Sequence, residues 1–109
     1  MKRLTLLPAL IFAAAVMSGP AHAQEAPAHK GYMDAMMKMD KAMPKDSTGN
    51  ADTDFARMMI PHHQAAVDMS KVLLQHGKDP ALRAMAQKVI TDQEKEIAEL
   101  QEWLKTHKK

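Results

Sequence analysis

Methionine and histidine are the side chains of this sequence best suited to bind a metal ion, and they gather in two short segments. Five methionines fall between Met33 and Met43, and residues 58–63 read Met-Met-Ile-Pro-His-His. Thioether sulfur needs no deprotonation and selects soft cations such as Cu(I) and Ag(I), whereas imidazole accepts both Cu(I) and Cu(II). Methionine also fills irregular cores, so packing is the alternative explanation for the same residues.

Helical periodicity positions both segments. We expect a first short helix over residues 31–43, which Pro44 ends. A second helix begins with Asp52 or Thr53 as N-cap and runs to His76, with Gly77 as the residue after its C-cap. A third runs from Pro80 to about Thr106 with Asp79 as N-cap. No strand-like alternation of useful length occurs. The fold class is therefore all-α, a long antiparallel helix hairpin with the short Met-rich helix lying across it.

The second helix has one apolar face, and His62 lies in the middle of it. On a helical wheel, the following residues lie within about 60° of His62: Phe55, Met58, Met59, Ala65, Ala66, Met69 and Leu73. His63 is rotated by about 100° onto a neighbouring strip. Met59 precedes the two histidines by three and four positions, which is contact distance on a helix. Pro61 removes one backbone hydrogen bond and kinks the axis just before the pair.

Two polar residues interrupt the apolar stripe of the third helix, Gln93 and Glu96. Metal-bound histidines usually donate their second ring nitrogen to a carboxylate or an amide. We therefore expect Gln93 or Glu96 to orient His62 or His63. The alternative is that both polar side chains extend to solvent at the edge of the bundle.

Residues 1–23 have the three parts of a secretory signal peptide. Lys2 and Arg3 give a positive start, residues 4–17 form an uncharged apolar run, and the segment ends in Ala-His-Ala before Gln24. A membrane anchor is the alternative, but 14 apolar residues are fewer than the roughly 20 that a bilayer requires. We expect cleavage after Ala23, export to the periplasm, a flexible tail over residues 24–30 and one helical domain over residues 31–109.

Removing the signal peptide changes the charge balance. The chain has 15 basic and 13 acidic side chains, and Lys2 and Arg3 leave with the signal, so the exported part has no net charge. A balanced surface argues against nucleic acid as a partner. The chain has no cysteine, so disulfides cannot stabilise this small domain, and a metal ion or a second subunit is the expected help. Pairing two hairpins would cover the remaining apolar surface, which predicts a homodimer.

The segment Met58-Met59-Ile60-Pro61-His62-His63-Gln64, with Gln93, Glu96 and Trp103 downstream, resembles a bacterial family of unknown function that has a ferritin-like helical fold and a Met-Ile-Pro-His-His-Gln signature. That family includes CopM-type periplasmic copper-binding proteins. The resemblance covers the chain from Gly31 onward. It implies binding of Cu(I) and Ag(I), a role in copper resistance, and a copper-handling protein as partner. The ligands that it implies are Met58, Met59, His62, His63 and Met69, with Met33, Met36 and Met37 as accessory ligands.

Other function classes have less support. Di-iron enzymes of ferritin-like fold need several inward carboxylates and Glu-x-x-His motifs, and no such motif occurs here. Nucleophilic hydrolysis is not supported either, because there is no cysteine and Ser70 has no recognisable elbow around it. We therefore expect neither an enzyme nor an organic cofactor. The remaining alternative is a metal-independent, chaperone-like periplasmic protein that presents a flexible Met-rich surface to its partners.

Overall fold

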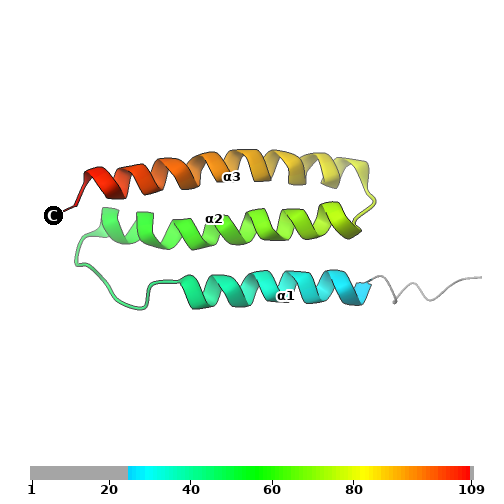
Figure 1. Cartoon of the computed structure of the whole chain (residues 1–109), viewed down its shortest axis with the longest axis horizontal. Coiled ribbons are helices and arrows are strands. Elements are labelled where there is room, and N and C mark those ends of the chain that lie inside the picture. The colour runs from blue at the N-terminus through cyan, green and yellow to red at the C-terminus, as the bar shows by residue number, and fades with distance from the viewer. Residues whose placement is uncertain (1–24, 109) are drawn as a thin grey trace, which may run out of the picture.

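Three helices make up residues 25–108, the part of the chain that the computed structural model describes. They are α1 (Glu25–Ala42), α2 (Ala51–His76) and α3 (Pro80–Thr106). Figure 1 shows them side by side in one layer, with α2 in the middle and each helix antiparallel to the next. Helix α2 contacts both neighbours, and no contact joins α1 to α3 in this part of the chain. The all-α class is confirmed for residues 25–108, which contain no strand.

Helix α1 begins earlier than its pattern predicted. The signal peptide predicted for residues 1–23 lies outside the described residues, as do Gln24 and Lys109. Residues 25–30, expected to belong to a flexible tail, form the first turns of α1 instead. Pro27 falls in the first turn, where a missing N–H costs no hydrogen bond, and Lys30 Nζ lies 2.6 Å from Asp34 Oδ2 one turn on. The longer α1 runs alongside α2 (Figure 1) rather than across the hairpin.

The two long helices are capped at their N-termini by side chains. Asn50, rather than the predicted Asp52 or Thr53, caps α2, and its Oδ1 accepts a hydrogen bond of 3.0 Å from the Thr53 N–H. Asp79 caps α3 as predicted, accepting from the Leu82 N–H at 2.9 Å. Each bond satisfies one of the N–H groups that a helix start leaves without a partner.

Gly77 ends α2, although in a different conformation from the one predicted. Its φ of −76° and ψ of 152° are extended rather than left-handed, and its N–H donates to the Leu73 carbonyl at 2.6 Å. A Cβ at this position would lie 2.3 Å from Leu73 Cδ1. Glycine is required here because the chain passes close to the last turn of α2, so the reason is close approach and not a positive φ.

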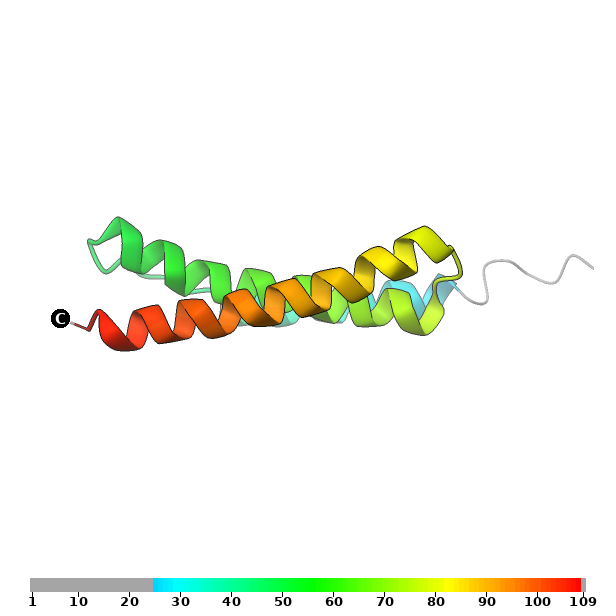
Figure 2. The same cartoon turned by 90° about the horizontal axis from the view of Figure 1, so that it is seen from above.

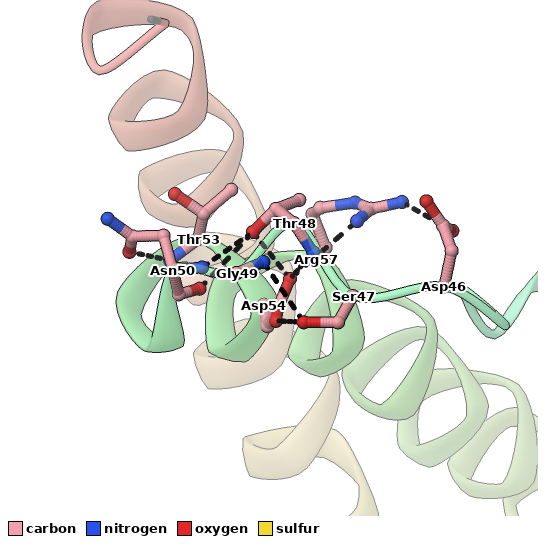
Figure 3. A network of polar contacts seen from close by, with 8 residues as sticks. All are labelled: Asp46, Ser47, Thr48, Gly49, Asn50, Thr53, Asp54 and Arg57. Carbon is pink, nitrogen blue, oxygen red and sulfur yellow. Dashed lines mark hydrogen bonds and ion pairs between the residues drawn. The ribbon is translucent and has the colours of Figure 1, made fainter.

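A polar network holds the connection between α1 and α2 against the first turns of α2, as Figure 3 shows. The Asp54 carboxylate accepts hydrogen bonds from Ser47 Oγ at 2.6 Å, Thr48 N at 2.9 Å and Thr48 Oγ1 at 2.7 Å. These bonds favour the ionised form and lower the pKa of Asp54 to about 2. Arg57 Nη2 adds a contact of 3.2 Å to Asp46 Oδ1. These contacts fix the loop against the first turns of α2, the helix that contains the Met-Ile-Pro-His-His segment.

The interior is thin and made of small side chains. The buried apolar residues are Ala35, Ala56, Ala65, Val67 and Ala86, and Val67 is the one large side chain among them that is fully buried. Seen from above in Figure 2, α3 crosses α2 at an inclination. Helices α1 and α2 also approach closely, since a Cβ on Gly31 would lie 2.8 Å from Val72 Cγ2. Close approach through small residues leaves many larger apolar side chains outside the interior.

Candidate functional site

Neighbouring helices cover α2 along two opposite strips. His63 lies in the strip that faces α3, as does the fully buried Val67. The strip that faces α1 contains the buried Ala65, and nearby Lys38 Nζ of α1 lies 3.5 Å from Asp68 Oδ2. On a helical wheel these strips lie about 100° to one side of His62 and about 90° to the other. Two faces of α2 therefore remain open, and one of them is centred on His62.

The open face around His62 is the most apolar face of the helix. His62 itself is exposed, Phe55 and Met58 are 60% and 47% exposed, and Met69 is 36% exposed. The apolar face of a surface helix ordinarily turns toward the core. In α2, strips of small residues face the neighbouring helices instead. The methionine-rich face with His62 at its middle points away from both of them. We call this surface the His62 face.

Helix α3 extends this surface on one side. A groove of about 370 Å³ runs between the two helices, and its lining residues are Phe55, Met59, His63, Glu96, Glu99, Leu100 and Trp103. It opens on the same side of the layer as Phe55, which lies close to His62 on the wheel. The groove and the His62 face are therefore adjacent, with Met59 between them.

Helix α1 places only some of its methionines on that side. Ala35 is buried against α2, and a step of about 100° from Ala35 turns Met36 toward the side of His62. The contact of Lys38 with Asp68 lies on the opposite side of the layer and fixes this orientation. Met33 and Met37 are about 160° from Ala35 on the wheel, at the outer edge of α1. These two predicted accessory ligands therefore lie apart from the histidines, whereas Met36 lies on their side.

His63 is buried and held by Glu96. Its Nε2 lies 2.5 Å from Glu96 Oε2, across the α2–α3 interface, and His63 is 8% exposed. Of the two residues expected to orient a histidine, Glu96 lies against His63. Gln93, by contrast, makes no hydrogen bond to either ring in the described part of the chain.

The second ring nitrogen of His63 has chemistry that suits a ligand. Nδ1 is buried and has no hydrogen-bond partner within residues 25–108. Because Nε2 faces an acceptor-only carboxylate, Nε2 is the donor, and in the neutral ring Nδ1 has a free lone pair. A histidine with one nitrogen on a carboxylate and a free lone pair on the other matches the usual arrangement of metal-binding histidines. Met59, one turn before His63 and lining the same groove, supplies the nearest soft donor by position.

The remaining predicted ligands divide by their position along α2. Met58, Met59, His62 and His63 fall within two turns, and the ring centroids of His62 and His63 are 6.1 Å apart. Met69 shares the His62 face but follows His62 by seven residues, about 10 Å along the axis. A single chain therefore places four of the predicted ligands within two turns of α2, whereas Met69 lies further along the helix.

Met39 and Met43 were not among the predicted ligands, yet both are half-buried on the α2 side of α1. The spacing of small residues in α1 could have predicted that these side chains are partly buried against α2. Gly31 and Ala35 mark the strip of α1 that touches α2, and Met39 continues that strip one turn later.

Two features are absent from residues 25–108, a cluster of metal-binding carboxylates and histidines and a membrane-spanning helix. The histidine, aspartate and glutamate side chains of this part form no group of three or more that could hold a metal ion. None of the three described helices combines the length and the apolar character needed to cross a membrane.

Comparison with known proteins places the chain in a family. The profile of the family described as "Domain of unknown function (DUF305)" matches residues 6–107. The chain is also similar to "Uncharacterized protein L153" of Acanthamoeba polyphaga mimivirus, with 39% identity over 49 residues. The aligned stretch is 45% of this chain and 32% of the viral protein, so this chain spans about a third of that relative.

Proposed function

The chain belongs to the DUF305 family, and we propose that it binds Cu(I), and Ag(I) by the same donors, through the methionines and histidines of α2. The observation that carries the proposal is His63, whose Nε2 is held by Glu96 at 2.5 Å while its buried Nδ1 has no hydrogen-bond partner within residues 25–108. Such a nitrogen is costly to bury without a ligand or a hydrogen bond.

The donor types support a soft cation. Met58, Met59, His62 and His63 offer thioether sulfur and imidazole nitrogen within two helical turns, a set that suits Cu(I) better than hard cations. In this proposal His63 binds through Nδ1 and Met59 approaches from the same groove, while Glu96 fixes the ring and its tautomer. His62 and Met58 present a second, more exposed pair of donors on the His62 face.

The setting that we propose is the periplasm, where the protein would contribute to copper resistance or homeostasis as CopM-type proteins do. Thiols oxidise in such a compartment, whereas thioethers and imidazoles stay usable. The same proposal includes a ferritin-like arrangement, in which a second hairpin completes a four-helix bundle with α2 and α3.

A titration with Cu(I) tests the proposal. The purified protein competes for Cu(I) with a chelator of known affinity under anaerobic conditions, and native mass spectrometry gives the stoichiometry. We expect a dissociation constant well below 1 µM, since a scavenger must outcompete weak surface sites. Replacing His62 and His63 together by leucine should weaken binding at least about 100-fold while circular dichroism shows unchanged helicity.

The matched control replaces two donors that lie away from the site. Met37 lies at the outer edge of α1, and His29 is exposed in the first half of the same helix, near Gly31, which faces Val72 toward the end of α2. The double variant Met37→Leu, His29→Leu removes one methionine and one histidine and should keep the wild-type affinity. Micromolar or weaker binding by the wild type would refute the proposal.

The exposed apolar side chains favour a second candidate, a metal-independent interaction protein. Met33, Met36 and Met37 on α1 and Leu82 and Met85 on α3 are each 42–60% exposed. Flexible methionines of this kind suit the binding of varied partners. In that function the histidine pair would be dispensable, so the leucine variants described above would retain partner binding and the wild type would show no tight Cu(I) site.

A further inference from the structure

The His62 face carries no lysine, arginine, aspartate or glutamate over the whole length of α2. From the first turn to the last, its residues are Ala51, Phe55, Met58, His62, Ala66, Met69, Leu73 and His76. Charged residues of this helix lie outside this face, for example Asp68 near α1 and Lys71 on the opposite side. A mainly apolar strip of this length, without such residues, on an open helix face indicates a surface that another chain covers.

The order of side chains on this face is close to palindromic. Phe55 and Leu73 both lie nine residues from position 64, Met59 and Met69 both lie five residues from it, and His62 and Ala66 lie two residues from it. Two antiparallel copies of α2 related by a two-fold axis at position 64 would therefore oppose Phe55 to Leu73, Met59 to Met69, and His62 to Ala66. A large side chain opposite a small one packs as a knob into a hole, so the face is complementary to itself.

The size of the face is sufficient for a stable dimer. Helix α2 has 26 residues, which gives a length of about 39 Å. Flanking side chains of α1 and α3, at interaxial distances of about 9 Å, widen the covered strip to about 20 Å. The resulting area is about 800 Å² per subunit, the amount that a standard specific interface buries.

The same pairing completes a set of metal ligands that one chain cannot supply. Met58 and His62 are one turn apart and can share an ion, but Met69 of the same helix is about 10 Å further along the axis. In the antiparallel pair, Met69 of the second copy lies at the level of residue 59, between Met58 and His62. Two thioethers and one imidazole then surround one position, a donor set that suits Cu(I).

We propose that a second copy of this chain docks on the His62 face, and that Cu(I) binds between the copies to Met58 and His62 of one and Met69 of the other. The dimer has two such sites related by symmetry. The metal part of this inference rests on the proposed function, whereas the docking of two copies through α2 can be measured without metal.

Sedimentation velocity, with and without Cu(I), tests the docking. Wild-type protein should sediment as a dimer, most completely with one Cu(I) per chain. Ala66→Lys places a positive charge opposite His62 and should give a monomer. Its matched control is Gln75→Lys, which adds the same charge to an exposed position of α2 outside the His62 face and should stay dimeric. A wild-type monomer in both conditions, or a dimer of the Ala66→Lys variant, would overturn the inference.

Complementation between two inactive variants tests the shared site. Met69→Leu and His62→Leu each remove a ligand from both shared sites of a homodimer, so either protein alone should lose one tight Cu(I) per chain and keep the binding at His63. In a mixed dimer one shared site regains all three ligands, and an equal mixture should recover about a quarter of the shared sites of the wild type. No recovery, while wild type binds tightly, would overturn the shared site and leave the proposed function standing. No tight binding by wild type would overturn both.

Discussion

The hydrogen bond between His63 and Glu96 should contribute measurably to stability, although Glu96 itself is half exposed. In Glu96→Ala the buried ring of His63 loses the only partner that it has within residues 25–108. The perturbation therefore leaves two unpaired nitrogens on a side chain that is 10% exposed.

The expected cost follows from this geometry. An unpaired buried polar group costs about 1–3 kcal/mol. Because the Glu96 side chain is 50% exposed, water can enter the groove and reach Nε2, which favours the lower half of that range. A loss of about 1–2 kcal/mol in a domain of this size lowers Tm by about 4–15 °C.

Thermal unfolding followed by circular dichroism measures the effect, at one fixed protein concentration and without metal. Glu96→Gln keeps an acceptor oxygen and should recover most of the loss. Glu99→Ala is the matched control, because Glu99 lines the same groove but its only ion pair within residues 25–108 is with Lys95, at 3.7 Å and on the surface. Such a pair contributes about 0.5 kcal/mol or less. Equal Tm values for Glu96→Ala and Glu99→Ala would refute the reasoning.

Three further outcomes are expected. Gly31→Ala should destabilise the packing of α1, because its Cβ would lie 2.8 Å from Val72 Cγ2. Adding Val72→Ala to the same chain should restore part of the loss. Hydrogen exchange of the α1 amides measures both effects. Val67→Ala removes two methyl groups from a fully buried position and should cost about 1–3 kcal/mol in urea unfolding. The lowered pKa of Asp54, about 2 against an ordinary 3.8, means that its stabilisation of the loop is complete above about pH 4 and is lost as the pH falls through 2. The Thr48 amide should therefore be protected from exchange at pH 5 but not at pH 1.5, and Asp54→Asn should abolish the protection at pH 5.

Local sequence signals predicted the long helices well. Asp79 followed by Pro80 fixed the start of α3, because a capping carboxylate and a proline at the first helical position act within one turn. The start of α2 lies at Asn50 rather than at Asp52 or Thr53, because the Asn50 side chain accepts the hydrogen bond from the Thr53 N–H that caps the helix. The early start of α1 was missed because residues 24–30 show no helical periodicity, although Pro27 is tolerated in a first turn.

The orientation of α2 shows what the pattern of a single helix cannot predict. The wheel grouped His62 with Phe55, Met58 and Met69, and these side chains are exposed together in the structure, whereas Ala65 of the same group is buried. It could not reveal that α1 and α3 occupy the two flanks of α2, which buries His63 and leaves His62 exposed. That choice depends on close approach through small residues such as Ala65 and Gly31, a property of pairs of helices and not of one.

The arrangement of α2 between two helices that never touch each other has a consequence for folding. Every contact between helices in the described chain joins consecutive helices. The sequence separation of contacting residues is therefore limited. Chains with such local contacts fold fast, typically within microseconds to milliseconds. The α2–α3 hairpin closes over a connection of three residues, whereas eight residues join α1 to α2, and the shorter connection loses less entropy on closing. We therefore expect α1 to dock after the hairpin has formed and its methionines to stay accessible until then.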